Sequence, residues 1–280
     1  MLARSRSAAL DWLRQTLNVV LCVTHVLAPG LYLLGIGTRI GTAHEPGRNL
    51  VEPVSWAFSI WGLIYPATIA YAIFQALPSQ RENELLRKIG FFTATTFLAS
   101  TAWSVVAQLQ EQAATQALML WVTVGLIFAM LASLLGTLVE IIEHRAPFRT
   151  AERYLVVAPF SVFAAWVTIA TIPNTASALR VSGFRNVLLP DTSWAVMMVV
   201  FAGLIGAFVT QASRGNAWWA LTFVWGLLGI LAENVLGGEI EVALTAGCMA
   251  ALVVLSFLGA GATPRLDALL DRRASHAARH

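Results

Sequence analysis

The sequence predicts an all-α integral membrane protein with about eight transmembrane helices, and three observations support this fold class. Of the 280 residues, 58% are hydrophobic and only 12% are charged, whereas a soluble domain carries about 25% charged residues. The mean hydropathy is +0.70, which a water-facing surface cannot carry without large exposed apolar patches. The apolar residues are grouped into runs of about 20 residues or longer, the length at which a helix crosses a bilayer.

The eight runs predict helices because a backbone in lipid must satisfy its own hydrogen bonds. Alternation with a period of two, which would indicate the strands of a membrane barrel, is not visible in the sequence. The first run follows basic residues, as in a signal peptide, but it lacks a small-residue cleavage pattern and is expected to be a retained span. In order, the runs lie at 14–36, 54–77, 89–109, 115–141, 154–179, 193–212, 217–236 and 241–261.

The cations are distributed unevenly between the two sides that these runs define. The odd-numbered connections hold only Arg39, Arg48, Arg180 and Arg185, and the other fourteen of the 18 cations lie in the N-terminal segment, the even-numbered connections and the tail. Because cytoplasmic loops collect Arg and Lys, both termini are predicted to be cytoplasmic. The net charge of +3 has the same origin, so no nucleic-acid partner is expected. The two cysteines lie inside apolar runs and predict neither a disulfide scaffold nor a zinc ribbon.

Aromatic and polar side chains form stripes on three of the predicted helices. Residues spaced by three or four positions share a helix face, and the predicted topology brings the three stripes to similar depths. Such stripes can pack helices against one another, or they can line a pocket for a flat ligand, and both interpretations stay open. The stripe residues are Phe58, Trp61 and Tyr65 on the second run, Ser100 and Trp103 on the third, and Phe163, Trp166, Ala170 and Asn174 on the fifth.

Other polar residues stand in or near the apolar runs. His25, midway along the first run, could ligate a tetrapyrrole iron, but a hydrogen bond to a neighbouring helix is favoured and no metal site is predicted. His44, with Arg39 and Arg48, could meet the anionic edge of a ligand or form a solvated loop. Glu233 lies near the outer end of the seventh run. An acidic side chain inside the bilayer is a candidate for a functional role, and the alternative is that Glu233 reaches the membrane–water interface. The sequence shows no motif of catalytic residues: no paired carboxylates, no Walker loop, no H-E-x-x-H and no nucleophile elbow.

Three segments carry a family resemblance. FSIWGLIY (58–65), ASTAWS (99–104) and PFSVFAAWVTIATIPN (159–174) lie on successive predicted helices. They resemble the tryptophan-rich sensory protein family, the TspO and mitochondrial translocator (peripheral benzodiazepine receptor) group. The resemblance covers about residues 14–180 and is closest to a longer bacterial-type branch with extra C-terminal helices. The chain departs from the family pattern at Ser100, where the family has Asn, and in the loop segment 52–56.

The resemblance implies a five-helix bundle over residues 1–180. Three additional transmembrane helices over 181–261 are expected to pack on it, because small residues such as Gly226 and Gly229 allow close helix approach. Residues 262–280 are expected to form a cytoplasmic tail, as the cation distribution predicts. The resemblance implies a pocket under the first loop, lined by Trp61, Trp103, Trp166 and Asn174, that binds porphyrin, haem or another flat or steroid-like lipophile. It also implies a location in the cytoplasmic (inner) membrane of a bacterium.

Four functions follow from these expectations. The preferred one is a membrane-embedded binding or sensory protein for a flat lipophilic ligand, with a tetrapyrrole as the favoured ligand. The alternatives are a transporter of a lipophilic solute, favoured by Glu233 and a fifth helix interrupted at Pro173, an intramembrane enzyme acting on the ligand, and a structural subunit of a pigment–protein complex. The expected partners are the lipid bilayer and a lipophilic small molecule, with a homodimer or a membrane complex left open.

The charge distribution generates the first prediction. Reporters fused at residue 45 and at the C-terminal tail should report opposite sides of the membrane, with the tail in the cytoplasm, because fourteen of the 18 cations lie on the side of the termini. Alkaline phosphatase and fluorescent-protein activities in intact cells measure this. Both fusions reporting the same side would contradict the predicted number of spans.

Overall fold

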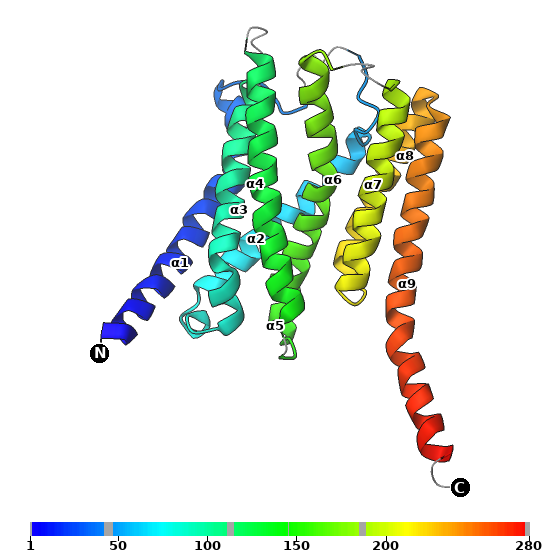
Figure 1. Ribbon diagram of the computed structural model, residues 1–280. Coiled ribbons are helices and arrows are strands. Elements are labelled where there is room, and N and C mark those ends of the chain that lie inside the picture. Colours follow the sequence, from blue (N-terminus) through cyan, green and yellow to red (C-terminus); the bar gives the residue numbers. More distant parts are fainter. Residues whose placement is uncertain (1, 42–46, 111–114, 145, 185–188, 278–280) are drawn as a thin grey trace.

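The computed structural model describes residues 2–41, 47–110, 115–144, 146–184 and 189–277. Within these residues, eight helical segments are long and apolar enough to cross a membrane, as the sequence predicts. α1 begins and α9 ends at the same end of the bundle (Figure 1), in keeping with an even number of spans. The spans are Ala8–Leu34, Ser55–Ala76, Glu84–Gln108, Gln116–Glu143, Thr150–Val181, Asp191–Ala212, Ala217–Gly237 and Ile240–Ala260.

Several spans combine an α-helix with a tighter or wider turn. In the first span, α1 (Leu2–Leu27) continues into the 3₁₀-helix η1 (Ala28–Leu34). The second span opens with a 3₁₀-helix, and the fifth passes through a π-helical turn. The remaining elements are η2 (Ser55–Ile60), α2 (Trp61–Ala76), η3 (Pro78–Gln80), α3 (Glu84–Gln108), α4 (Gln116–Glu143), α5 (Thr150–Glu152), η4 (Arg153–Val157), α6 (Ala158–Val181), α7 (Asp191–Ala212), α8 (Ala217–Gly237) and α9 (Ile240–Ala277).

Local sequence explains where several helices begin and end. The side chain of Asn83 accepts a hydrogen bond from the backbone N–H of Leu86 and so caps α3. Asn216 caps α8 in the same way, accepting from Trp218 and Trp219. Gly238 ends α8 in the left-handed conformation, with φ of 81°. The expected interruption of the fifth span at Pro173 is wrong: α6 continues through Pro173 to Val181.

α6 is the central helix of the bundle. In its most apolar stretch 83% of the residues are buried inside the protein, against at most half in each of the other described spans. It lies against α2, α4, α7 and α8, while α3 bridges α1 and α4. Most side chains of α6 therefore contact protein rather than lipid.

The C-terminal helices are joined to the rest of the bundle mainly through α8. Gly226 brings α8 so close to α6 that a Cβ there would lie 2.4 Å from Cδ1 of Ile169. Gly229 likewise brings α8 close to the segment before α2, because a Cβ at Gly229 would lie 2.8 Å from Cβ of Ala57. α9 packs on both α7 and α8. Small residues at such contacts let helix backbones approach closely.

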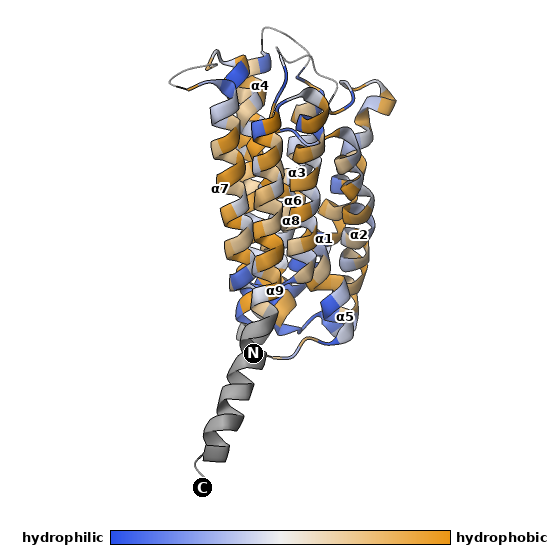
Figure 2. Ribbon diagram, turned by 90° about the vertical axis from the view of Figure 1, so that its right-hand side faces the viewer, coloured by the Kyte–Doolittle hydropathy of each residue, from blue (hydrophilic) through white to orange (hydrophobic). Residues whose placement is uncertain are grey.

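The outward surface of the bundle is apolar between its two ends. Figure 2 shows the hydrophobic colour over the middle of the helices and hydrophilic residues gathered at their ends. Among the exposed large side chains are Phe201, Phe208, Leu221 and Leu255. This surface is suited to lipid, as the composition predicts.

The close approach at Gly229 generates the second prediction. Gly229→Ala should lower the melting temperature of the purified protein, because its Cβ would meet Ala57 and Pro53 within 3 Å and overpacking costs about 1–3 kcal/mol. Gly125→Ala in α4 is the matched control, since a Cβ there meets no atom within 4 Å. Equal melting temperatures for the two variants would show that α8 does not bear on this segment.

Candidate functional site

The predicted stripes meet around His25, whose side chain is completely buried. Its imidazole lies between two phenylalanine rings, with centroid distances of 5.3 Å to Phe97 and 5.4 Å to Phe163, both in stacked orientation. Tyr65 approaches its edge at 5.1 Å, and Trp61 lies at 6.3 Å. Side chains from α1, α2, α3 and α6 thus form one aromatic cluster inside the bundle, which we call the His25 cluster.

Trp61 also contacts two other rings of this cluster. The ring of Trp61 stacks on that of Tyr65 at 5.0 Å and meets the ring of Phe163 edge-on at 5.7 Å. Offset and edge-to-face pairs of this kind contribute about 0.5–1.5 kcal/mol beyond the burial of their area. The structure therefore brings two of the three predicted stripes into direct ring contact.

Trp166 lies beside the cluster rather than within it. Its side chain is 1% exposed, and its ring meets the ring of Phe58 edge-on at 5.5 Å. Phe58 is itself 40% exposed at the outer surface of η2. The pair forms a path of rings from the bundle interior to the surface. Ala170, the next stripe residue on α6, is partly buried against the same core.

Ser100 provides the hydrogen-bonding partner of His25. The Nδ1 atom of His25 and the Oγ atom of Ser100 are 2.8 Å apart, and both side chains are buried. This contact confirms the expected bond between His25 and a neighbouring helix. The other ring nitrogen, Nε2, is buried without a hydrogen-bond partner.

Trp103 and Asn174 are joined to each other by a hydrogen bond. The indole Nε1–H of Trp103 donates to Oδ1 of Asn174 at 2.7 Å, and Nδ2 of Asn174 donates to Oγ1 of Thr123 at 2.9 Å. The chain of bonds links α3, α6 and α4. It uses one acceptor and one donor of the amide, which has two further positions available for hydrogen bonds.

The charged candidates lie at the end of the bundle away from the termini. Arg48 forms an ion pair with Glu233 at 3.3 Å and also donates to its backbone carbonyl. Arg180 donates to the backbone carbonyl of Arg48. Arg39 is exposed on the same connection, and His44 lies outside the described residues. Glu233 is therefore half of an ion pair at the end of α8.

The segment that follows Arg48 is held between α6 and α8. Asn49 donates to the carbonyl of Pro173 at 3.1 Å, Asn234 donates to the carbonyl of Leu50 at 2.8 Å, and Trp225 donates to the carbonyl of Ala57 at 3.0 Å. α8 therefore holds the segment that leads into Phe58 and Trp61, although the motif resemblance ends with the fifth span.

Sequence reasoning missed a buried polar network at the end that carries the termini. Asn18 donates to the carbonyl of Gly90 at 2.7 Å, and Thr93 donates to Oδ1 of Asn18 at 2.6 Å. Gln15 and Gln75 donate to each other's backbone carbonyls. Arg14, 1% exposed, donates to the carbonyls of residues on the neighbouring helix and turn. Polar residues at positions 14, 15 and 18 of an apolar run were the signal for this network.

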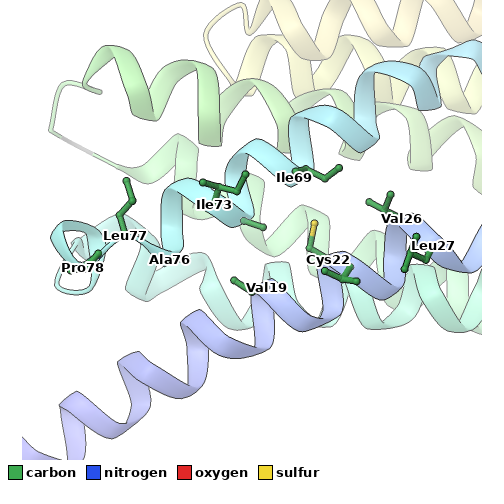
Figure 3. Close-up of a pocket in the computed structure, with 11 residues that line it drawn as sticks. Val19, Cys22, Val26, Leu27, Ile69, Ile73, Ala76, Leu77 and Pro78 are labelled. Carbon is green, nitrogen blue, oxygen red and sulfur yellow. The ribbon is translucent and has the colours of Figure 1, made fainter.

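A groove opens to the bilayer side between α1 and α2 (Figure 3). Its volume is about 540 Å³, and its walls are apolar apart from the thiol of Cys22. Cys22 and Val26 line it from α1, and Ile69 and Ile73 line it from α2. Figure 1 shows α1 diverging from the other helices toward its N-terminal end, which widens the gap. Among the described residues, no group of three or more His, Cys, Asp or Glu side chains could hold a metal ion.

Comparison with protein families places the whole bundle in one group. A family model described as TSPO-like protein matches residues 15–259. The chain belongs to the TSPO-like protein family. The family match extends beyond residue 180, where the motif resemblance ends, and takes in the last three spans. Comparisons with curated proteins and with solved structures gave no match.

The bond between Trp103 and Asn174 generates the third prediction. Trp103→Phe should destabilise the protein by about 1–3 kcal/mol, because it leaves a polar atom of Asn174 without its donor. Asn174→Leu should cost a similar amount, and the double variant should cost less than the two changes together, since they share one bond. Thermal unfolding in detergent measures this double-mutant cycle. Strictly additive losses would show that the two side chains do not interact.

Proposed function

We propose that the protein is a membrane-embedded binding or sensory protein for a flat lipophilic ligand, and that the ligand is a tetrapyrrole. Family membership supports a binding or sensory role in the membrane. The finer proposal rests on the His25 cluster and its neighbours, with Phe58, Trp61, Tyr65, Ser100, Trp103, Trp166, Ala170 and Asn174 as the ligand-binding residues.

The observation that carries this proposal is the convergence of rings from four helices. Trp61 contacts both Tyr65 and Phe163, and Phe58 and Trp166 extend the cluster toward the surface. Aromatic faces recognise a flat apolar molecule by stacking, and a small number of polar groups then fix its orientation. Trp61, Tyr65 and Phe58 retain exposed surface, so a ligand would make its contacts along η2 and the start of α2.

The cations at the outer connection give the anionic edge of such a ligand a place to bind. Arg39 and His44 lie on this connection, and Arg48 faces Glu233 in an ion pair. A ligand carboxylate at Arg48 would replace the carboxylate of Glu233. Glu233 would then act as an internal competitor, which lowers the affinity for a ligand carboxylate at Arg48.

The transporter alternative loses the two features that favoured it. Glu233 is paired with Arg48 at the end of the bundle, and α6 is continuous through Pro173. Solute accumulation in vesicles that depends on Glu233 would still favour transport over binding. Co-purification with a pigment–protein complex would favour the structural subunit, and ligand bleaching with product formation would favour an enzyme.

The remaining expectations are part of the same proposal. We place the protein in the cytoplasmic membrane of a bacterium with both termini in the cytoplasm, which the cation distribution supports. The first five spans, residues 1–180, would form the binding bundle, and the helices of 181–261 would complete its cover. A homodimer or a membrane complex would form through the apolar outer faces, such as that of α7.

Titration with protoporphyrin IX generates the fourth prediction. Trp166→Leu should weaken binding several-fold to about tenfold, because it removes a stacking face worth about 0.5–1.5 kcal/mol while keeping an apolar side chain. Asn174→Leu should weaken it comparably, by a hydrogen bond of about 1 kcal/mol. Quenching of tryptophan fluorescence by the porphyrin measures the affinity, and thermal unfolding is followed in parallel.

Trp219→Leu is the matched control for this experiment. Trp219 is as deeply buried as Trp166 but lies in α8, stacked on Phe223. Its replacement should lower stability and leave the affinity for protoporphyrin IX unchanged. If Trp166→Leu and Asn174→Leu behave in the same way as this control, the residues pack helices and the site assignment is wrong.

A further inference from the structure

The apolar groove between α1 and α2 lies in the half of the bundle nearer the termini. Its wall on α2 runs from Ile69 to Leu77 and ends at Pro78, the first residue of η3. At about 1.5 Å per residue this wall is about 12 Å long, which approaches one leaflet, half of the roughly 30 Å hydrocarbon core. The groove is therefore long enough to hold most of one acyl chain lying along α2.

The walls of the groove are open to lipid. Val23 and Leu27 of α1 and Ile73 of α2 are each more than half exposed. The volume of about 540 Å³ lies within the range of small-molecule sites, about 300–1,000 Å³. Figure 3 shows α1 diverging from α2 toward the end that carries Val19 and Leu77, so the groove widens in that direction. A chain lying in the groove would thus enter from the membrane surface on the side of the termini.

A cation stands at this wide end of the groove. Arg81 follows η3, and its backbone N–H donates to the carbonyl of Pro78 at 3.3 Å. Its Nε atom donates to Oε1 of Gln15 at 3.4 Å, and Nε2 of Gln15 donates to the carbonyl of Leu77 at 3.3 Å. These bonds hold the guanidinium of Arg81 beside the groove residues Leu77 and Pro78.

The charge of Arg81 is available to a ligand. No ion pair within the described part of the chain includes Arg81, and the neighbouring carboxylate of Glu82 lies 3.8 Å from Arg87. The guanidinium lies over the exposed ring of Trp12, 3.9 Å from its centre, and tryptophan is typical of the membrane–water interface. An arginine presents five N–H donors, and the bond to Gln15 uses the one on Nε.

We propose that the groove binds one anionic phospholipid from the leaflet on the side of the termini, with an acyl chain between α1 and α2 and the phosphate against Arg81. By the cation distribution this is the cytoplasmic leaflet. Basic pockets between helices on that side are typical sites for anionic headgroups. An anionic headgroup fits better than a zwitterionic one, because it neutralises a guanidinium that has no carboxylate partner among the described residues.

This site is independent of the proposed porphyrin site. The groove residues and Arg81 are not among the residues proposed to bind a porphyrin. The bound lipid would fill the space between α1 and α2 on the outer side of the bonds between Gln15 and Gln75. Because a ligand that binds only the folded state stabilises that state, the lipid would also raise the melting temperature.

The headgroup is tested by lipid titration of the purified, delipidated protein in detergent, followed by native mass spectrometry. Phosphatidylglycerol and phosphatidylcholine with the same acyl chains are compared, and the wild type should retain one phosphatidylglycerol in preference. Arg81→Gln should lower the affinity for phosphatidylglycerol about fivefold, to that for phosphatidylcholine. Arg153→Gln is the matched control, since Arg153 is an exposed arginine at the same end of the bundle, in η4, and it should behave as the wild type does.

The groove is tested by filling it. Ala76 lines the groove and is exposed, so Ala76→Phe should weaken binding of both lipids about tenfold and abolish the rise in melting temperature with phosphatidylglycerol. Ala251→Phe, on an exposed position of α9, is the control and should retain the lipid. Phosphatidylglycerol with a photoreactive group on its acyl chain tests the wild type directly, even if Ala76→Phe fails to fold, and should cross-link to residues within 19–27 and 69–78.

The possible results decide each part of the proposal. Equal wild-type affinities for the two lipids, or an Arg81→Gln variant that behaves as Arg153→Gln does, would overturn the anionic headgroup site. Cross-links confined to other helices, or retention of phosphatidylglycerol by a folded Ala76→Phe variant, would overturn the groove as the site of the chain. Selective loss in Arg81→Gln together with cross-links on α1 and α2 supports both parts.

Discussion

Lipid offers no hydrogen bonds, so a polar side chain away from the ends of the bundle needs a partner within the protein, on its own helix or on another. Each pairing between two helices favours one neighbour over the others. Asn18 joins α1 to the backbone of α3, and the reciprocal bonds of Gln15 and Gln75 join α1 to α2. Apolar surfaces gain little from choosing one helix over another, because lipid tails are as apolar as leucine. These few polar pairs therefore set the order of the helices on which the rest of the structure depends.

The hydrogen bonds between helices also position the residues of the candidate site. The polar network fixes α1 against α2 and α3 near the termini, and the Trp103–Asn174 bond fixes α3 against α6 further along. His25 lies between these two sets of bonds, so its position is determined from both directions. The cluster is consequently rigid on the sides of α3 and α6, and its weaker boundary is the seam between α1 and α2.

Much of the fold could be predicted from the sequence because each span is encoded within its own run. Run length and hydropathy gave the number of helices, and three-to-four spacing gave the faces of α2, α3 and α6 that meet. Periodicity within a helix does not say which helix lies opposite. Phe97 in the cluster, the pairing of Arg48 with Glu233, and the contacts of Trp225 with the segment before α2 therefore emerged only from the structure. The continuity of α6 through Pro173 could not be predicted either, because the residues next to Pro173 in the sequence do not indicate how the neighbouring helices pack around it.

The docking of the segment around Ala57 onto α8 has a consequence for how the protein is made. A chain enters the membrane from its N-terminus, so this segment is synthesised long before Gly229 and Trp225, the residues that receive it. The first five spans are therefore in the bilayer before α8 is inserted, and until then the segment around Ala57 lacks its contacts with α8. The segment that leads into Phe58 and Trp61 therefore reaches its final packing only when synthesis of α8 is complete.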